Sequence, residues 1–126
     1  MRYQASITVP AGTLRSEPAT QVVPVTFGYI EQCEVLFPPG QSGLVNVQVW
    51  YHERQIFPTS PGESFIGDDH LIIFPEKYPV FEAPFEVVLV GWSPGAVLEH
   101  TVYVALTVEA PLGGWVVESV PVPLPE

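Results

Sequence analysis

The acidic cluster Asp68-Asp69-His70, with Glu63 nearby, is the most site-like group of residues in this sequence. Hard cations such as Ca²⁺ take oxygen ligands in loops, so the cluster could hold a weak metal site. No ladder of spaced Asp or Asn residues accompanies it, however, and a Gly-Asp-Asp turn accounts for the same residues. The sequence therefore predicts a turn at 67–69 and no metal.

The three histidines and the single cysteine offer a second set of candidate ligands. Three histidines can hold a catalytic zinc ion, but tens of residues separate His52, His70 and His100, and spacing alone does not show that they converge. Cys33 alternates with polar residues beside Val35, which favours a small buried thiol over a nucleophile. A lone cysteine also excludes an intramolecular disulfide and a cysteine metal cluster.

Motifs for catalysis are missing, since there is no Gly-x-Ser-x-Gly elbow and no glycine-rich phosphate loop. We predict a protein that is not an enzyme and needs no cofactor. The tryptophans are the remaining hint, because an exposed tryptophan can stack on a sugar ring. Trp50 lies on the polar face of its predicted strand and is the candidate for a glycan contact, whereas Trp92 and Trp115 fit core or interface packing.

Composition limits the partners of the chain. Its 126 residues suffice for one domain with a real core. Fourteen acidic residues face four basic ones, and a net charge of −10 disfavours nucleic acid and anionic membranes. Charged residues make up 14%, against about 25% in typical soluble domains. Such a chain either hides part of its surface in an oligomer or buries many strands. The N-terminus MRYQASITVP lacks the apolar core of a signal peptide.

The elements that must position these residues are strands. The clearest alternation spans 43–58, where Val45, Val47, Val49 and Tyr51 oppose Asn46, Gln48, Trp50 and His52, and we predict one central strand there. Further strands are predicted at 3–9, 20–27, 29–37, 64–66, 70–74, 85–92, 99–108 and 115–120. Pro24 should place its strand at an edge or a bulge. Fifteen prolines and ten glycines leave little room for helices.

Eight or nine short strands predict an all-β fold, an antiparallel two-sheet β-sandwich of the jelly-roll type. An immunoglobulin-type sandwich would more often carry a cysteine pair around a tryptophan. The chain is predicted to be a single domain over 1–126, with its core at about 3–120 and an extended proline-rich tail at 121–126. The residues predicted to share the core are Val45, Val47, Val49, Val87, Leu89, Val102, Val104 and Leu106.

Three stretches of the sequence carry a family resemblance: GYIEQCEVLFPPGQSGLVNVQVWYHERQIFP, GESFIGDDHLIIFPEKYPVFEAPFEVVLVGW and EHTVYVALTV. They resemble small jelly-roll proteins encoded among the virion genes of tailed phages, over about residues 7–108. The shared motifs are turns and core positions without a catalytic signature. The resemblance implies a capsid decoration, adaptor or accessory protein, located in the virion and assembled in the host cytoplasm.

Our first hypothesis is therefore a non-enzymatic structural virion protein that forms a homo-oligomer and contacts other virion proteins, such as the major capsid protein. A trimer is favoured, because jelly rolls often pack around a threefold axis. The loop at 13–19 and the tail at 120–126 could each reach a neighbour. The predicted interface residues are Tyr29, Trp50, Tyr78, Phe81 and Trp115. The alternative is a carbohydrate- or ligand-binding β-sandwich module with Trp50 as its glycan contact. A cupin-type enzyme is the least supported, since clustered histidine ligands are missing.

Overall fold

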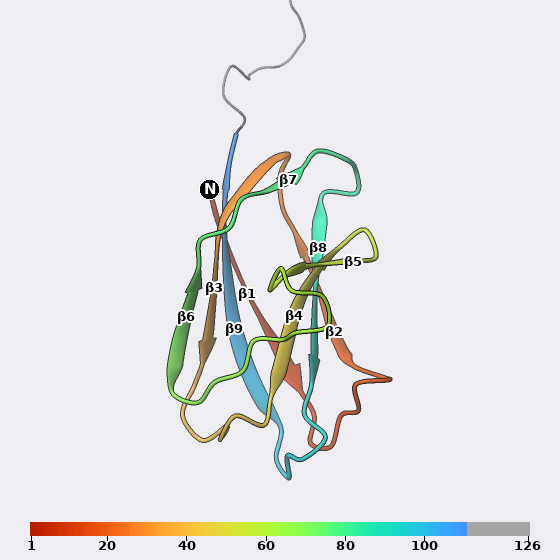
Figure 1. Cartoon of the computed structure of the whole chain (residues 1–126), viewed down its shortest axis with the longest axis vertical. Helices are drawn as coiled ribbons and strands as arrows, with labels where there is room; N and C mark the ends of the chain where they lie inside the picture. The colour runs from red at the N-terminus through yellow and green to blue at the C-terminus, as the bar shows by residue number, and fades with distance from the viewer. Residues whose placement is uncertain (111–126) are drawn as a thin grey trace, which may run out of the picture.

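Two antiparallel β-sheets packed face to face form the protein, as the computed structural model of residues 1–110 shows (Figure 1). The first sheet, sheet A, contains in spatial order β1 (Arg2–Val9), β9 (His100–Glu109), β3 (Gly28–Phe37) and β6 (His70–Phe74), with β7 (Tyr78–Val80) pairing with the start of β3. The second, sheet B, contains β2 (Ala19–Pro24), β8 (Glu86–Trp92), β4 (Asn46–Tyr51) and β5 (Arg54–Phe57). Within residues 1–110 no helix could span a membrane.

The strand order is that of a jelly roll. The chain passes back and forth between the sheets, so that β9 inserts between β1 and β3 while β8 inserts between β2 and β4. Two four-stranded sheets with this order are the eight-stranded double Greek key. The short β7 is a ninth strand, and the predicted fold class is confirmed.

Every residue predicted to share the core is buried between the sheets. Val47 and Val49 of sheet B and Val104 and Leu106 of sheet A contribute to this one cluster, at 0–3% exposure. The alternation of apolar and polar residues predicted these positions because successive side chains in a strand point to opposite faces of the sheet. Pro24 ends β2, and β2 pairs with β8 alone among the described strands, which confirms the prediction of an edge position.

The prediction of one central strand over 43–58 is wrong. The segment is a hairpin of β4 and β5, which reverses at His52 and Glu53, whose φ angles are 50° and 63°. Positive φ at both central residues is the geometry of a tight hairpin turn. The glycine that usually marks such a turn is missing here, so the turn could not be predicted from its residues. β4 is consequently the third strand of sheet B, next to the edge strand β5.

Other boundaries differ from the predictions in smaller ways. The predicted strand at 64–66 is a single bridge between Phe65 and Val47. Residues 78–80, where no strand was predicted, pair with β3 as β7. The predicted strand at 115–120 and the tail at 121–126 lie outside the described residues.

The buried layer predicts a large effect of Val104→Asp. Val104 is 3% exposed within the core cluster, so the substitution would place an unpaired charge there at a cost of several kcal/mol, about the whole stability of a small domain. We expect the variant to lose its cooperative thermal transition, monitored by circular dichroism. The neighbouring Tyr103 points outward and is 49% exposed, so Tyr103→Ser is the matched control and should stay folded. Equal melting of both variants would contradict this assignment of faces.

Candidate functional site

Four aromatic side chains gather at one end of the sandwich, and we call this group the aromatic end: Phe27, Tyr29, Phe81 and Phe85. The ring of Phe27 stacks on that of Phe81 with centroids 4.9 Å apart. The ring of Phe85 meets that of Phe27 edge-on, with centroids 6.1 Å apart. The ring of Tyr29 meets that of Phe81 edge-on, with centroids 5.0 Å apart. The three phenylalanines remain 37–49% exposed. Exposed clusters of this kind typically mark protein-interaction surfaces, because large apolar rings are costly to leave in water.

Two segments far apart in sequence build the aromatic end, the turn between β2 and β3 and the loop between β7 and β8 (Figure 1). The hydroxyl of Tyr51 fixes the loop, because it donates to the carbonyl oxygen of Glu82 at 2.6 Å and accepts from the backbone N–H of the same residue at 3.1 Å. Gly28 fixes the turn. A Cβ at Gly28 would collide with the carbonyl oxygen of Glu109, so only glycine allows β3 to start this close to β9.

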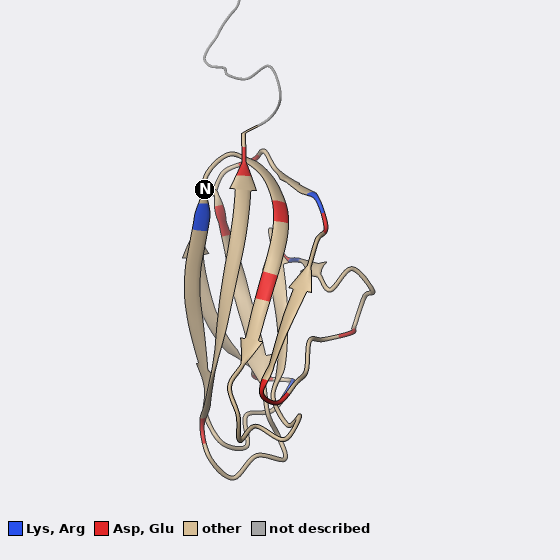
Figure 2. Ribbon diagram, turned by 90° about the vertical axis from the view of Figure 1, so that its left-hand side faces the viewer, with Lys and Arg blue, Asp and Glu red and all other residues tan. Residues whose placement is uncertain are grey.

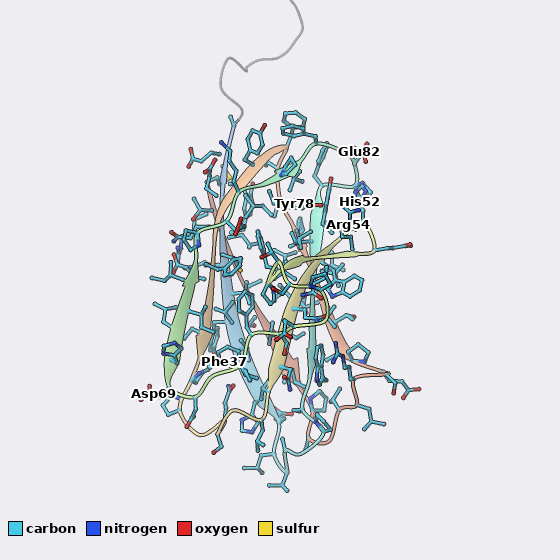
Figure 3. All side chains as sticks on the ribbon, in the orientation of Figure 1. Phe37, His52, Arg54, Asp69, Tyr78 and Glu82 are labelled. Atoms are coloured by element: carbon cyan, nitrogen blue, oxygen red, sulfur yellow. The ribbon has the colours of Figure 1, made fainter. Side chains whose placement is uncertain are left out.

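Charged groups surround the aromatic end without covering it. The ammonium of Lys77 lies over the ring of Tyr29, 4.5 Å from its centroid, and 3.8 Å from a carboxylate oxygen of Glu31. On the other side, His52 lies 4.0 Å from the carboxylate of Glu82 (Figure 3). An apolar centre with a polar rim is the usual arrangement of a protein–protein contact.

A second candidate site is an open hollow of about 820 Å³ on sheet B, which we call the Trp50 groove. Trp50, Gln48 and Val90 contribute from adjacent strands, and Arg15, Arg54 and Tyr78 add to the lining. The indole N–H of Trp50 donates to the side-chain oxygen of Gln48 at 2.9 Å. This bond holds the ring in a fixed position while Trp50 stays half-buried.

Two loops border the Trp50 groove. The side-chain amide of Gln55 donates to the carbonyl oxygens of Pro58, Ser60 and Glu63, and so holds the loop after β5 in shape. Arg15, from the loop between β1 and β2, donates to the carbonyl oxygen of Gly62 at 2.9 Å and lies 4.8 Å from the ring centroid of Trp92. Both loops are thereby tied together.

A third surface is the outward face of sheet A, which carries few charges (Figure 2). Leu36, Leu71, Ile73 and Tyr103 are 41–56% exposed there, on three adjacent strands. They lie on the same face as a bidentate pair in which Arg2 donates to Glu34 at 2.8 and 3.2 Å. This hydrogen bonding, together with that from Gln32, lowers the pKa of Glu34. The resulting stabilisation is present above the pKa of glutamate in the unfolded chain and is lost as the pH falls through the lowered value.

The structure brings together some of the predicted interface residues. Tyr29 and Phe81 meet in the aromatic end, while Trp50 and Tyr78 both line the Trp50 groove. Tyr78 is half-buried against Tyr51 and Phe57 and therefore also closes the core. Trp115 lies outside the described residues.

Sequence reasoning missed Phe27 and Phe85, which it assigned to the ends of strands. The signal that could have found them is their position next to Gly28 and Pro84. Glycine and proline often end strands, so the residues beside them lie at the end of the sheet.

Asp68 has a structural role at the opposite end of the sandwich. Its carboxylate accepts from the backbone N–H groups of Gly40 and Gln41 at 2.9 and 3.0 Å, and so joins two turns. His52 lies in the hairpin turn near the aromatic end, whereas Asp69, beside His70, is far from it (Figure 3). In the part of the chain covering residues 1–110, no three His, Cys, Asp or Glu side chains are placed to hold a metal ion.

Cys33 belongs to the core, as predicted. Its side chain is 0% exposed within the apolar cluster. Burial is the main cause that raises the pKa of the thiol to about 12, and the nearby carboxylate of Glu34 adds to the effect. The nucleophilic form of cysteine is the thiolate, so this thiol has little reactivity in the folded protein.

Comparison of the chain with protein-family models gives no match, and comparison with curated proteins gives no significant match either. Any function must therefore be argued from the three surfaces described above.

Burial predicts that Cys33 resists alkylation. With its pKa at about 12, about one thiol in ten thousand is ionised at pH 8. We expect iodoacetamide to leave the folded protein unlabelled over hours, as read by intact mass, and to label it fully in guanidinium chloride. Rapid labelling of the folded protein would contradict a core position.

The contacts of Asp68 predict an effect on stability that is independent of metal. Asp68→Ala removes two hydrogen bonds to backbone N–H groups and should reduce the free energy of unfolding by about 1 kcal/mol. Thermal melts of the wild type with calcium and with a chelator should coincide. Asp69→Asn, in the same turn, is the control, since asparagine tolerates the φ of 50° at this position and no hydrogen bond of the Asp69 side chain to residues 1–110 is found. A chelator-induced drop of many degrees would instead indicate a cation site.

Proposed function

We propose that this protein is a non-enzymatic structural component of a tailed-phage virion, a capsid decoration, adaptor or accessory protein. It acts by forming a homo-oligomer and by binding other virion proteins, such as the major capsid protein. The observation that carries this proposal is the aromatic end, an exposed group of stacked rings on a jelly-roll scaffold. The location of the protein in a virion is inferred from the sequence resemblance to small phage jelly-roll proteins.

The arrangement of the aromatic end supports a protein partner. Aromatic anchors near the centre of a contact supply most of its binding energy, and a polar rim excludes water around them. Phe27 and Phe81 provide the anchors, while Lys77, Glu31 and Glu82 provide the rim. Burying one fully exposed phenylalanine side chain is worth about 1.5–3 kcal/mol, and these two rings, already partly covered, would contribute less each.

The charge of the chain supports the same class of partner. A net charge of −10 repels nucleic acid and favours a basic or uncharged protein surface. The outward face of sheet A, with few charges and several exposed apolar side chains, offers further contact area (Figure 2). A trimer remains the favoured oligomer because jelly rolls often pack around a threefold axis.

A second candidate function is a carbohydrate-binding module, and the Trp50 groove favours it. A half-buried tryptophan ring can stack on a pyranose, and side chains such as Arg54 and Glu53 can bond to its hydroxyl groups. A monomer that binds soluble glycans would place this function first.

The proposal predicts that Phe27→Ser/Phe81→Ser weakens the oligomer. Losing both stacked rings should raise the dissociation constant at least about tenfold, since 1.4 kcal/mol already corresponds to that factor. Analytical ultracentrifugation at micromolar concentration is the measurement, and thermal melts show that the variant remains folded.

Leu98→Ser is the matched control, because Leu98 is also apolar and 67% exposed but lies in the loop before β9, away from the aromatic end. Its oligomer should match that of the wild type. A wild-type protein that stays monomeric, with no gain in mass when the capsid partner is added, would contradict the structural role. Dissociation by Leu71→Ser, and not by the double variant, would place the contact on sheet A instead.

A further inference from the structure

The Trp50 groove holds a large share of the positive charge of the chain. Arg15 and Arg54, two of the four basic residues, line it. The other two are paired elsewhere, Arg2 with Glu34 and Lys77 with Glu31. Arg54 forms no ion pair with any of residues 1–110. Glu53 also lines the groove, so two positive charges stand against one negative charge there. On a protein with a net charge of −10, the groove is therefore a local site of net positive charge that favours an occupant carrying negative charge.

The C-terminal sequence VPVPLPE, residues 120–126, has the complementary chemistry. Proline at every second position favours the polyproline II conformation, and such segments bind grooves lined by aromatic side chains. The segment ends on Glu126, and Glu118 precedes it. It therefore offers proline rings for Trp50 and carboxylates for the arginines.

The path of the chain determines which copy of the groove this segment can reach. β9 ends at Glu109 beside the aromatic end and points out along the long axis of the molecule (Figure 1). Residues 110–126 can span about 50 Å when extended. The Trp50 groove belongs to sheet B, on the other side of the sandwich from β9. The end of β9 points past the end of the sandwich and not toward the groove of its own copy (Figure 1), which favours the groove of a neighbouring copy as the acceptor.

We propose that residues 120–126 of one copy dock in the Trp50 groove of a neighbouring copy. The proline rings pack on the ring of Trp50, and the Glu126 carboxylate pairs with Arg54. This inference rests on the proposed function, because it supplies a contact for the homo-oligomer. A contact between tail and groove joins two different surfaces, so repeating it around an axis closes a ring such as a trimer.

Sedimentation velocity of full-length variants at micromolar concentration tests the docking. Trp50→Ala removes the ring on which the prolines are proposed to pack, and Pro121→Ser/Pro123→Ser/Pro125→Ser changes the proposed occupant while every residue of the groove stays the same. We expect both variants to become largely monomeric, with dissociation constants raised at least tenfold. Leu98→Ala, at a 67% exposed position in the loop before β9 and outside the groove lining, is the control and should sediment like the wild type. An equimolar mixture of the two defective variants should form pairs, because one intact groove can still accept one intact tail.

Every other outcome would contradict the docking of the tail in the groove. These outcomes also show whether the docking alone fails or the proposed homo-oligomer fails with it. If the wild type and both variants form the same oligomer, the docking is wrong and the structural role stands. A monomeric wild type refutes the homo-oligomer itself. If Trp50→Ala dissociates the oligomer but the proline variant does not, the groove binds another part of the neighbour. Three results together would make the groove a glycan site: cellohexaose quenches the tryptophan fluorescence of the wild type, Trp50→Ala abolishes this quenching, and the proline variant forms the same oligomer as the wild type.

Discussion

The fold depends on the burial of one layer of branched apolar side chains between two sheets. Val47 and Val49 of β4 face Val104 and Leu106 of β9 in this layer, and each fully buried side chain of this size contributes about 1.5–3 kcal/mol. Because side chains alternate along a strand, burying one face also determines which residues point outward. The exposed Tyr103 and the half-buried Trp50 hold their positions for this reason, so the surfaces of the protein follow from its core.

The ends of the sandwich obey a different constraint, since the layer between the sheets must be closed where the strands stop. Tyr78 closes it at one end by packing against Tyr51 and Phe57. The hydroxyl of Tyr51 then binds the backbone of Glu82 and holds the loop that presents Phe81. One tyrosine thus links the core to the aromatic end, and the same packing that completes the fold holds the proposed interface rigid. A rigid aromatic anchor loses little conformational entropy on binding.

The aromatic end and the Trp50 groove suggest a division of roles between apolar and charged contacts. With only four basic residues in the chain, the placement of two in one groove is a strong local feature on an acidic protein. Apolar rings would supply affinity at the aromatic end, and the arginines would select an acidic segment at the groove. Both surfaces suit a protein that assembles with copies of itself.

The sequence by itself determined the all-β class, the eight core positions and the buried thiol of Cys33, because alternation and proline spacing are local properties. The jelly-roll type was predicted from the number of strands, the missing cysteine pair and the family resemblance, and it is the strand order of the two sheets that confirms it. It could not reveal the hairpin at His52 and Glu53, since their positive φ angles are maintained by strand pairing and not by a turn residue. Nor could it show that Phe27 meets Phe81, or that Arg15 reaches Gly62, because 54 and 47 residues separate these pairs. Only the tertiary structure brings such residues together, since the contacts depend on how the sheets stack.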